Sequence, residues 1–267
     1  MSNFKLGFIG IGNMAGAILE GIISRNAILA ENVYAYDIRE TARDRASALG
    51  VHVAEDVIDV AKSADIVLVG VKPKDTLAVV KEMSGELNGK ALLSIVAGLG
   101  YDELRGALNG VDARILTILP NTPIMVGEGA TGFTTETTFL EEEKAFVQSL
   151  FEAVGIVEWA PTKLLPAVTA LSGGGPAYAA MFVEALADGG VLEGLPRDMA
   201  YRLAAKTIQG TGKLILETGD HPGAVKDSVC SPGGTTIEAV KELEKNQFRY
   251  AVLNAVHKAR EKFSRLV

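Results

Sequence analysis

Two glycine-containing stretches of the sequence hold residues whose types and spacing suit the binding of anions. The first, GFIGIGNMAGAI, places Gly10, Gly12 and Ala15 in the pattern G-x-G-x-x-A, directly after an apolar β-type run. Glycines at the first two positions permit a tight turn and let the backbone approach a pyrophosphate, which the N–H groups and dipole of the next helix attract. This stretch therefore predicts a dinucleotide-binding turn.

The second stretch, SPGGTTIEAV at residues 231–240, places a proline, two glycines and two threonines directly before a helical pattern. Serine and threonine at this place are also ordinary helix caps. Two glycines remove Cβ atoms, so successive backbone N–H groups could converge on a small anion at the helix N-terminus. Its own residues leave open whether it is a simple helix start or an anion socket.

The run VYAYDIR ends in two residues of opposite charge, Asp37 and Arg39. At the end of the second strand of a dinucleotide-binding unit, an acidic residue accepts hydrogen bonds from the ribose of NAD, whereas a cation favours the 2′-phosphate of NADP. Asp37 therefore argues for NAD and Arg39 for NADP, and the choice between NADH and NADPH stays open. Asp37 could also simply end the strand and cap the next helix.

Two further strand ends carry polar residues: Val71, Lys72 and Pro73 follow the run DIVLVG, and the sequence PNTP at residues 120–123 follows RILTI. Ligands of open α/β sheets bind outside the carboxyl ends of the strands. Asn121 and Thr122, held between two prolines, could present an amide and a hydroxyl to a nicotinamide carboxamide. An ordinary turn explains PNTP about as well.

The elements that must position these residues alternate between strands and helices over residues 1–160. Helices are expected near 13–24 and 40–49, and strands at KLGFIG, VYAYDI, 65–71, 91–97, 114–120, 130–135 and 155–160. This alternation implies right-handed crossovers and a largely parallel sheet. The fold class is therefore α/β, with an N-terminal Rossmann-type doubly wound domain.

Residues 161–267 show helical spacing only, and form an all-helical second domain. Helices are expected to start at Pro176, Pro196 and Pro222, because proline is favoured at the first helical position. The segment PAYAAMFVEALA is apolar nearly all round, so it needs cover on every side. Pairing of this domain with its copy in a homodimer would supply that cover, whereas the alternative is a self-sufficient helical bundle.

Composition excludes several classes of protein. The 267 residues are 48% hydrophobic, and 26 basic against 33 acidic side chains give a net charge of −7 with no Lys/Arg block, so nucleic acid is not an expected partner. No apolar run is long enough to span a membrane, and the glycine-interrupted N-terminus is expected to be folded protein rather than a signal. Cys230 is the single cysteine and three scattered histidines show no ligand pattern, so we expect a cytoplasmic protein without a metal site.

With these residues in place, the chain resembles the pyrroline-5-carboxylate reductases. The resemblance covers essentially the whole chain, and rests on the motifs GFIGIGNMA, VKP, PNTP, EGAT, LSGGGPAY, EALADGGV, GLPR and HPGAVKDSVCSPGGTTIEAV. The last of these is the family's signature. The resemblance implies a Rossmann-type domain followed by a helical domain that interlocks with that of a second subunit, and an active site between the nucleotide domain and the dimer helices. Rings of five dimers, decamers, occur in relatives.

The resemblance also implies roles for individual residues. Thr236 matches the threonine whose hydroxyl contacts the ring nitrogen of the substrate, and is the expected catalytic residue. Ser231, Gly233, Gly234 and Thr235 match the turn that holds the substrate carboxylate. The expected cofactor contacts, for NADPH or NADH, are Gly10, Gly12, Asn13, Met14, Asp37, Arg39, Val71, Lys72, Pro73, Ala97, Gly98, Asn121 and Thr122. An asparagine that often serves the adenosine ribose in the family has no counterpart in Ala54-Glu55-Asp56-Val57.

The implied reaction is hydride transfer to C5 of the cyclic imine of pyrroline-5-carboxylate, which gives L-proline. A neutral threonine hydroxyl is a poor acid, so Thr236 is expected to orient the substrate nitrogen, with the proton coming from the iminium or from water. One alternative is a β-hydroxyacid dehydrogenase, which needs a catalytic lysine in the second domain; Lys163, Lys206, Lys213 and Lys226 all lie outside the SGGGP helix. Another is a nucleotide sensor that binds the cofactor without turnover.

Overall fold

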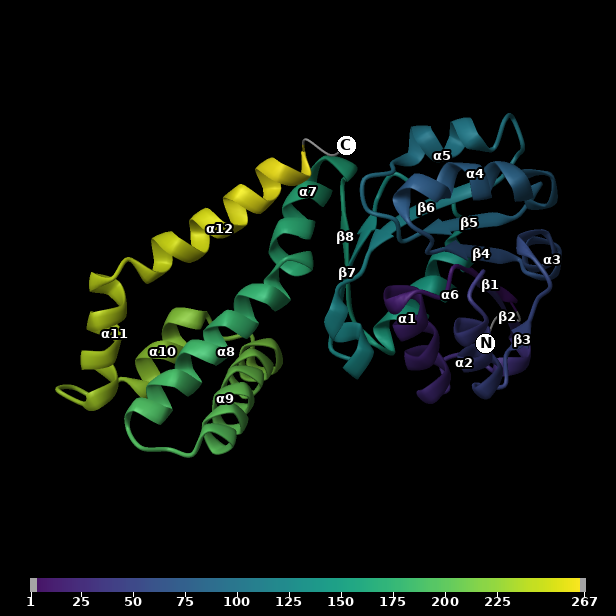
Figure 1. The fold of residues 1–267 in the computed structure, drawn as a ribbon. Helices are drawn as coiled ribbons and strands as arrows, with labels where there is room; N and C mark the ends of the chain where they lie inside the picture. The colour runs from purple at the N-terminus through teal and green to yellow at the C-terminus, as the bar shows by residue number, and fades with distance from the viewer. Residues whose placement is uncertain (1–3, 265–267) are drawn as a thin grey trace. The chain divides into compact units, whose positions relative to one another are not determined.

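The computed structural model describes residues 4–264, which divide into two compact units. Among the described residues, unit 1 comprises 4–173 and 260–264, and unit 2 comprises Gly174–Ala259 (Figure 1). The last strand of unit 1 ends at Ala160, the residue at which the sequence places its domain boundary. The short helical segments that follow, as far as Gly173, belong to the same unit as the sheet.

Unit 1 is built on an eight-stranded sheet with the strand order β3-β2-β1-β4-β5-β6-β7-β8. The strands are β1 (Leu6–Ile9), β2 (Val33–Tyr36), β3 (His52–Val53), β4 (Ile66–Val69), β5 (Ala91–Ser94), β6 (Arg114–Leu119), β7 (Gly129–Thr134) and β8 (Gly155–Ala160). All pairs from β3 to β6 are parallel, and the order reverses between β1 and β4. This is the doubly wound arrangement that the sequence predicts.

Alternate residues of the inner strands enter two separate cores, one on each face of the sheet. Phe8 and Leu68 belong to one core, and their neighbours Ile9 and Val69 belong to the other. Because successive side chains of a strand point to opposite faces, a strand covered on both sides must be apolar at every position. This requirement explains the uninterrupted apolar runs LGFI and IVLV.

Helices cover the two faces of this sheet (Figure 1). Residues of α1 (Asn13–Ser24), α2 (Glu40–Ala48) and α6 (Glu141–Glu152) enter the first core, and those of α3 (Val57–Ser63), α4 (Pro73–Met83) and α5 (Tyr101–Ala107) enter the second. The expected helices at 13–24 and 40–49 are thus confirmed. The sequence missed β3, a two-residue exposed strand without an apolar run, and extended β5 three residues too far.

The far edge of the sheet departs from the parallel pattern. Strand β7 pairs antiparallel with β6, with Ile118 opposite Phe133, and β8 is parallel to β7. A parallel connection requires a crossover of a dozen or more residues, whereas residues 120–128 provide only a short link containing the 3-10 turn Thr122–Val126. The short link therefore turns the chain back on itself.

Unit 2 is entirely helical, as expected. It contains α8 (Gly175–Leu192), α9 (Arg197–Thr218), α10 (Pro222–Val229), α11 (Thr235–Lys245) and the greater part of α12 (Phe248–Phe263). The three proline positions do mark helix starts, but only Pro222 is a first helical residue; Pro176 is the second residue of α8, and Pro196 is the N-cap of α9. Proline fits all three places because none of them needs its missing N–H.

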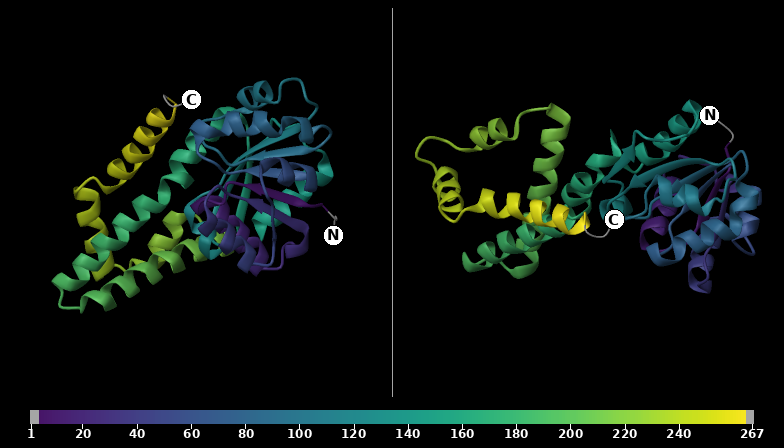
Figure 2. Two further views of the ribbon diagram at one scale, coloured as in Figure 1. Left: turned by 45° about the vertical axis from the view of Figure 1, so that its right-hand side comes forward. Right: turned by 90° about the horizontal axis from the view of Figure 1, so that it is seen from above.

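Few apolar side chains of unit 2 are buried. Helices α8 and α9 lie side by side (Figure 2) and enclose only Ala187, Ala200 and Ala204, with Val183 and Val191 partly buried. Larger apolar side chains remain exposed, among them Met181 at 70%, Leu192 at 84% and Leu253 at 67%. Exposed apolar side chains of this size are typical of protein–protein interfaces, in keeping with the cover that the sequence predicts for PAYAAMFVEALA.

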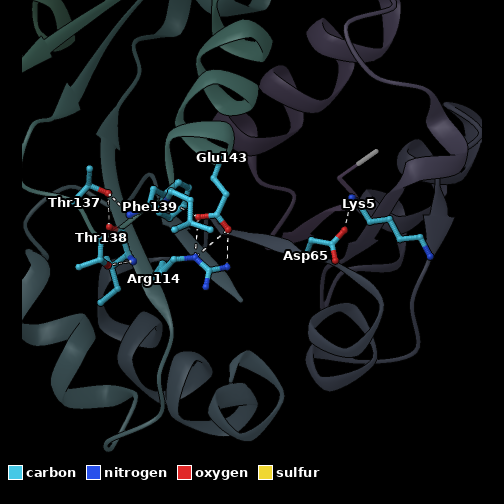
Figure 3. Close-up of polar contacts among 9 residues, drawn as sticks. Lys5, Asp65, Arg114, Thr137, Thr138, Phe139 and Glu143 are labelled. Atoms are coloured by element: carbon cyan, nitrogen blue, oxygen red, sulfur yellow. Dashed lines mark hydrogen bonds and ion pairs between the residues drawn. The ribbon is translucent and has the colours of Figure 1, made fainter. Parts of the chain in front are cut away.

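A buried ion pair fastens the start of β6 to α6. The Arg114 guanidinium donates to both carboxylate oxygens of Glu143, at 2.8 Å from Nε to Oε2 and 2.6 Å from Nη2 to Oε1 (Figure 3). Glu143 is only 2% exposed, and its Oε2 also accepts from the N–H of Leu140, the N-cap of α6. One carboxylate therefore neutralises a partly buried cation and caps a helix.

We predict that Glu143→Ala lowers the free energy of unfolding of unit 1 by about 3 kcal/mol, because it leaves Arg114 without its partner and α6 without its cap. Glu143→Gln keeps an acceptor for Leu140 and should cost less. Unfolding by denaturant is monitored through the fluorescence of Trp159, the single tryptophan. Its indole N–H donates a hydrogen bond to Gln148 of α6, so its fluorescence reports on this part of the unit. Glu141→Ala, at an exposed residue of the same helical turn, is the control; equal losses for the two alanine variants would contradict the prediction.

Candidate functional site

The predicted dinucleotide turn joins β1 to α1. Gly10 has φ +82° and donates its N–H to the carbonyl of Tyr36 in β2, at 2.9 Å. Gly12 is the N-cap of α1, with extended backbone angles and no side chain capping the helix. The first N–H groups of α1 therefore point out of the turn without a side-chain acceptor, as an anion site requires.

The two glycines serve different purposes. A Cβ on Gly10 would lie 2.6 Å from the Cγ1 of Val71 and 2.9 Å from its backbone nitrogen, so this position must stay bare for β1 and β4 to end side by side. A Cβ on Gly12 would have no atom within 4 Å and would project into open space. Gly12 thus leaves free the place where a ligand's phosphates would approach the backbone. Ala15 packs against Gly70, whose Cβ would lie 2.8 Å from that of Ala15.

A cavity of about 770 Å³ opens beside this turn, at the carboxyl ends of β1, β2 and β4. It lies where the strand order reverses, which is the general ligand site of open α/β sheets. Its lining includes seven of the predicted cofactor residues, Gly10, Gly12, Asn13, Asp37, Arg39, Val71 and Lys72. A cavity of this size, with a bare glycine turn and an uncapped helix at its edge, fits a dinucleotide cofactor.

The sequence missed several lining residues. Lys74 and Asp75 come from the first turn of α4, directly after the predicted Val71-Lys72-Pro73, and Ile38, Val57 and Val79 add apolar surface. The strand end gave the signal for Lys72, and extension by one helical turn would have found its neighbours. The segment 54–57, in which the sequence shows no counterpart of the family's ribose asparagine, contributes Val57 to the cavity lining. Its Asp56 caps α3, because the carboxylate accepts a hydrogen bond from the N–H of Asp59.

Asp37 is almost entirely surrounded by donors. Its Oδ2 accepts from the N–H of Ile11 at 2.8 Å and from Nη2 of Arg39 at 3.2 Å, and its Oδ1 accepts from the backbone N–H and Nε of Arg39 at 2.9 and 3.1 Å. Burial alone would raise the pKa of Asp37, but these hydrogen bonds and the charge of Arg39 outweigh it and lower the pKa below its usual value. The carboxylate therefore stays ionised at neutral pH.

The remaining predicted cofactor residues lie outside this cavity. Met14 and Pro73 are in the first turns of α1 and α4, and Thr122 and Ala97 are exposed. Gly98 lines a smaller cavity of about 90 Å³ together with Leu99, Tyr101 and Thr117. Contacts of these residues with a cofactor stay predictions.

Asn121 is buried and is used within the protein. Its Oδ1 accepts from the N–H of Ala130 at 2.8 Å, and its Nδ2 donates to the carbonyl of Ser172 at 3.0 Å. The side chain thereby ties the link after β6 to the start of β7 and to the π-helical turn Thr169–Gly173. A direct contact between Asn121 and a nicotinamide, as the sequence suggested, would have to share atoms that already make these bonds.

The SPGGTT stretch joins α10 to α11 in unit 2. Gly234 donates to the carbonyl of Ser231 at 3.0 Å, Gly233 has φ +69°, and Gly234 is the N-cap of α11. Thr235 and Thr236 are the first two residues of α11, and no side chain caps this helix. The left-handed backbone at Gly233 is the position in this turn that favours glycine, whereas a Cβ on Gly234 would lie 2.3 Å from the Oγ of Ser231 and 3.1 Å from its carbonyl oxygen. The residues expected to hold the substrate thus form one continuous turn at an open helix N-terminus.

Known proteins match this chain over nearly its full length. The family model described as pyrroline-5-carboxylate reductase dimerisation matches residues 162–266, and that described as NADP oxidoreductase coenzyme F420-dependent matches residues 5–98. A pyrroline-5-carboxylate reductase of Escherichia coli is 43% identical over 267 residues, with 98% of each chain covered. The chain belongs to the pyrroline-5-carboxylate reductase family.

Solved structures of the pyrroline-5-carboxylate reductase family share the fold over the full length. The enzyme of Coxiella burnetii aligns with a TM-score of 0.93 at 31% identity, covering 99% of both chains. The Plasmodium falciparum enzyme, solved with NADP bound, aligns with a TM-score of 0.86 at 34% identity, covering 100% of this chain and 99% of the other. The Rossmann-type fold followed by a helical domain, predicted from the sequence, is thereby confirmed for this member of the reductase family.

The bare position at Gly12 gives a direct test of the dinucleotide site. We predict that Gly12→Ala weakens NADPH binding at least about tenfold, because the new methyl group occupies the place where phosphates would approach the backbone. The thermal midpoint should hardly change, since the Cβ contacts no protein atom. Calorimetric titration and thermal unfolding provide the two measurements, and Gly85→Ala, where a Cβ also meets nothing, serves as the control. Unchanged binding in Gly12→Ala would place the cofactor elsewhere.

Proposed function

We propose that this protein reduces 1-pyrroline-5-carboxylate to L-proline, with the hydride coming from NADPH or NADH. The observation that carries the proposal is the 43% identity, over 98% of both chains, to a reductase named for this substrate. The cavity beside the glycine turn and the open SPGGTT turn supply two sites of the right chemistry, one for a dinucleotide and one for a carboxylate. A member of this family has been solved with NADP bound.

In this proposal the turn Gly10–Asn13 receives the pyrophosphate of the cofactor at the N-terminus of α1. Successive N–H groups and the positive end of the helix dipole stabilise negative charge there. Ile38 is 85% exposed and lines the cavity with Val57, so the two side chains offer apolar surface to an adenine ring. The bound cofactor supplies the hydride, and the protein supplies placement and charge complementarity.

The SPGGTT turn holds the substrate carboxylate. The N–H groups of Thr235, Thr236 and Ile237 lie in the first turn of α11, where no side chain competes for them. The hydroxyl of Thr236 then donates to the ring nitrogen of the imine, or accepts from the N–H of the protonated iminium, and so fixes the face that receives the hydride at C5. A hydroxyl is too weak an acid to protonate the imine at neutral pH, so its contribution is orientation.

We further propose that the protein acts as a homodimer formed through the helical unit, in the cytoplasm. The exposed apolar side chains of α8, α9 and α12 support the dimer, and the single, half-buried Cys230 is in keeping with a reducing compartment. A decamer of five dimers is a further assembly to be tested by light scattering at several protein concentrations. No helix among residues 4–264 combines the length and apolarity needed to cross a bilayer.

The activity is tested by mixing purified protein with pyrroline-5-carboxylate and either NADPH or NADH, and following the loss of reduced-nicotinamide absorbance. We expect rapid oxidation with at least one cofactor, and L-proline as the product. Cofactor binding without oxidation would instead indicate a nucleotide sensor. Reduction of NADP⁺ or NAD⁺ by a β-hydroxy acid, with no reduction of pyrroline-5-carboxylate by NADPH or NADH, would indicate a dehydrogenase of the β-hydroxyacid type.

The role of Thr236 is tested by matched substitutions. We predict that Thr236→Ala lowers kcat on the order of a hundredfold, because the imine loses the hydrogen bond that orients it. Thr236→Ser keeps the hydroxyl and should stay within about tenfold of the unchanged protein. NADPH affinity, measured by titration without substrate, should be the same in all three proteins. Full turnover in Thr236→Ala would refute the assignment.

A further inference from the structure

We propose that Asp37 and Arg39 act as one unit in which Asp37 braces the glycine turn and Arg39 selects a 2′-phosphate, so that the protein prefers NADPH to NADH. This inference rests on the proposed use of a nicotinamide dinucleotide. It settles the opposing signals of the two residues in the sequence, where Asp37 alone would indicate NAD. It assigns neither residue to the chemical step.

The acceptor capacity of Asp37 is already in use. Each of its two oxygens accepts two hydrogen bonds from the protein, and the residue is only 6% exposed. A carboxylate that binds the two hydroxyls of an adenosine ribose must offer them free lone pairs. Asp37 could do so only by giving up a bond to Arg39 or to Ile11, and loss of a buried hydrogen bond offsets the gain.

The bond from Ile11 to Asp37 fixes the turn that faces the phosphates. Ile11 lies between Gly10 and Gly12, and its N–H donates to Asp37 while its carbonyl accepts from Nη2 of Arg39 at 3.3 Å. Both polar groups of this peptide unit are thus held by the Asp37–Arg39 pair. The carboxylate at the end of β2 therefore controls the shape of the glycine turn after β1, and acts on cofactor binding through that turn.

Arg39, unlike Asp37, is open to the cavity. Its side chain is 53% exposed, and within the part of the chain that the structure describes only Nε and Nη2 donate hydrogen bonds, to Asp37 and Ile11. Nη1 carries two further N–H donors, for which the described residues provide no acceptor. Because the pairing with Asp37 fixes the guanidinium plane in advance, little side-chain freedom is lost when those donors meet a phosphate.

The charges around the cavity favour the additional phosphate. Arg39, Lys72 and Lys74 line it together with Asp37 and Asp75, and Asp37 is committed to its internal bonds. The pair raises the pKa of Arg39 further, chiefly through its hydrogen bond to Asp37, so the guanidinium is charged at every pH of interest. A 2′-phosphate adds about two negative charges and three acceptor oxygens, which these cations can meet.

Binding of adenosine fragments tests this inference without any use of the reaction. Adenosine 2′,5′-bisphosphate and AMP differ by the phosphate in question, and both are titrated calorimetrically into the full-length protein. We expect the bisphosphate to bind at least about tenfold more tightly than AMP. Arg39→Gln should lower the affinity for the bisphosphate by about tenfold to a hundredfold, and the affinity for AMP by less than about threefold. Arg45→Gln, which removes an equal charge from an exposed position of α2, should change neither affinity.

Asp37→Asn distinguishes between two roles of the carboxylate, support of the glycine turn and direct binding of the ribose. If Asp37 shapes the turn, the affinities for both ligands fall by a similar factor and the preference for the bisphosphate persists. A loss confined to AMP, with the bisphosphate unaffected or improved, would show Asp37 to be a ribose ligand and would overturn the proposal, as would equal binding of the two fragments to the unchanged protein. Far-ultraviolet circular dichroism checks the fold of each variant. If Asp37→Asn does not fold, the unchanged protein and Arg39→Gln still decide the question, while the assay with pyrroline-5-carboxylate decides the proposed function independently.

Discussion

The close approach of β1 and β4 is the constraint on which the nucleotide site depends. Gly10 and Gly70 directly follow these neighbouring strands, and the chain leaves the two strands in opposite directions around the sheet. A side chain on Gly10 would collide with Val71, and one on Gly70 would collide with Ala15. With both positions bare, the glycine turn, the first turn of α1 and the start of α4 can surround one cavity. The bare backbone of the glycine turn forms one side of this cavity, and the charged and apolar side chains that follow β2 and β4 form the other.

Two ion pairs in unit 1 illustrate different uses of the same chemistry. Arg114 and Glu143 lie away from the cavity, and their pair joins a strand to a helix while Glu143 also caps that helix. Asp37 and Arg39 lie at the cavity edge, and their pair holds Ile11 in the glycine turn while the outer part of Arg39 stays exposed. Because Glu143 is buried, the first pair contributes to the stability of the fold. The partial exposure of the second lets it contribute to recognition.

The two units bury their apolar residues in different ways. The sheet of unit 1 has a core of large apolar side chains on each face. In unit 2 small residues fill the contact between α8 and α9, and larger ones such as Met181 and Leu253 stay at the surface. Helices of this composition gain most of their stability from packing. A second copy of the chain would supply that packing, which links the fold of the helical unit to oligomerisation.

The sequence by itself determined the alternation of strands and helices, the dinucleotide turn at Gly10 and Gly12, the helical nature of the second unit and the family. These features follow from the spacing of apolar residues within each segment and from residue types, such as glycine in a tight turn. Both can be seen in residues that are close together along the chain. It could not determine that β7 runs against β6, that Asn121 is used to tie β7 in place, or that Lys74 and Val57 reach the same cavity as Arg39. Those depend on pairing between distant segments. Above all, the sequence showed Asp37 and Arg39 as rival signals, and only the tertiary structure brought Ile11 between them, because a carboxylate's partners are set by what surrounds it in space.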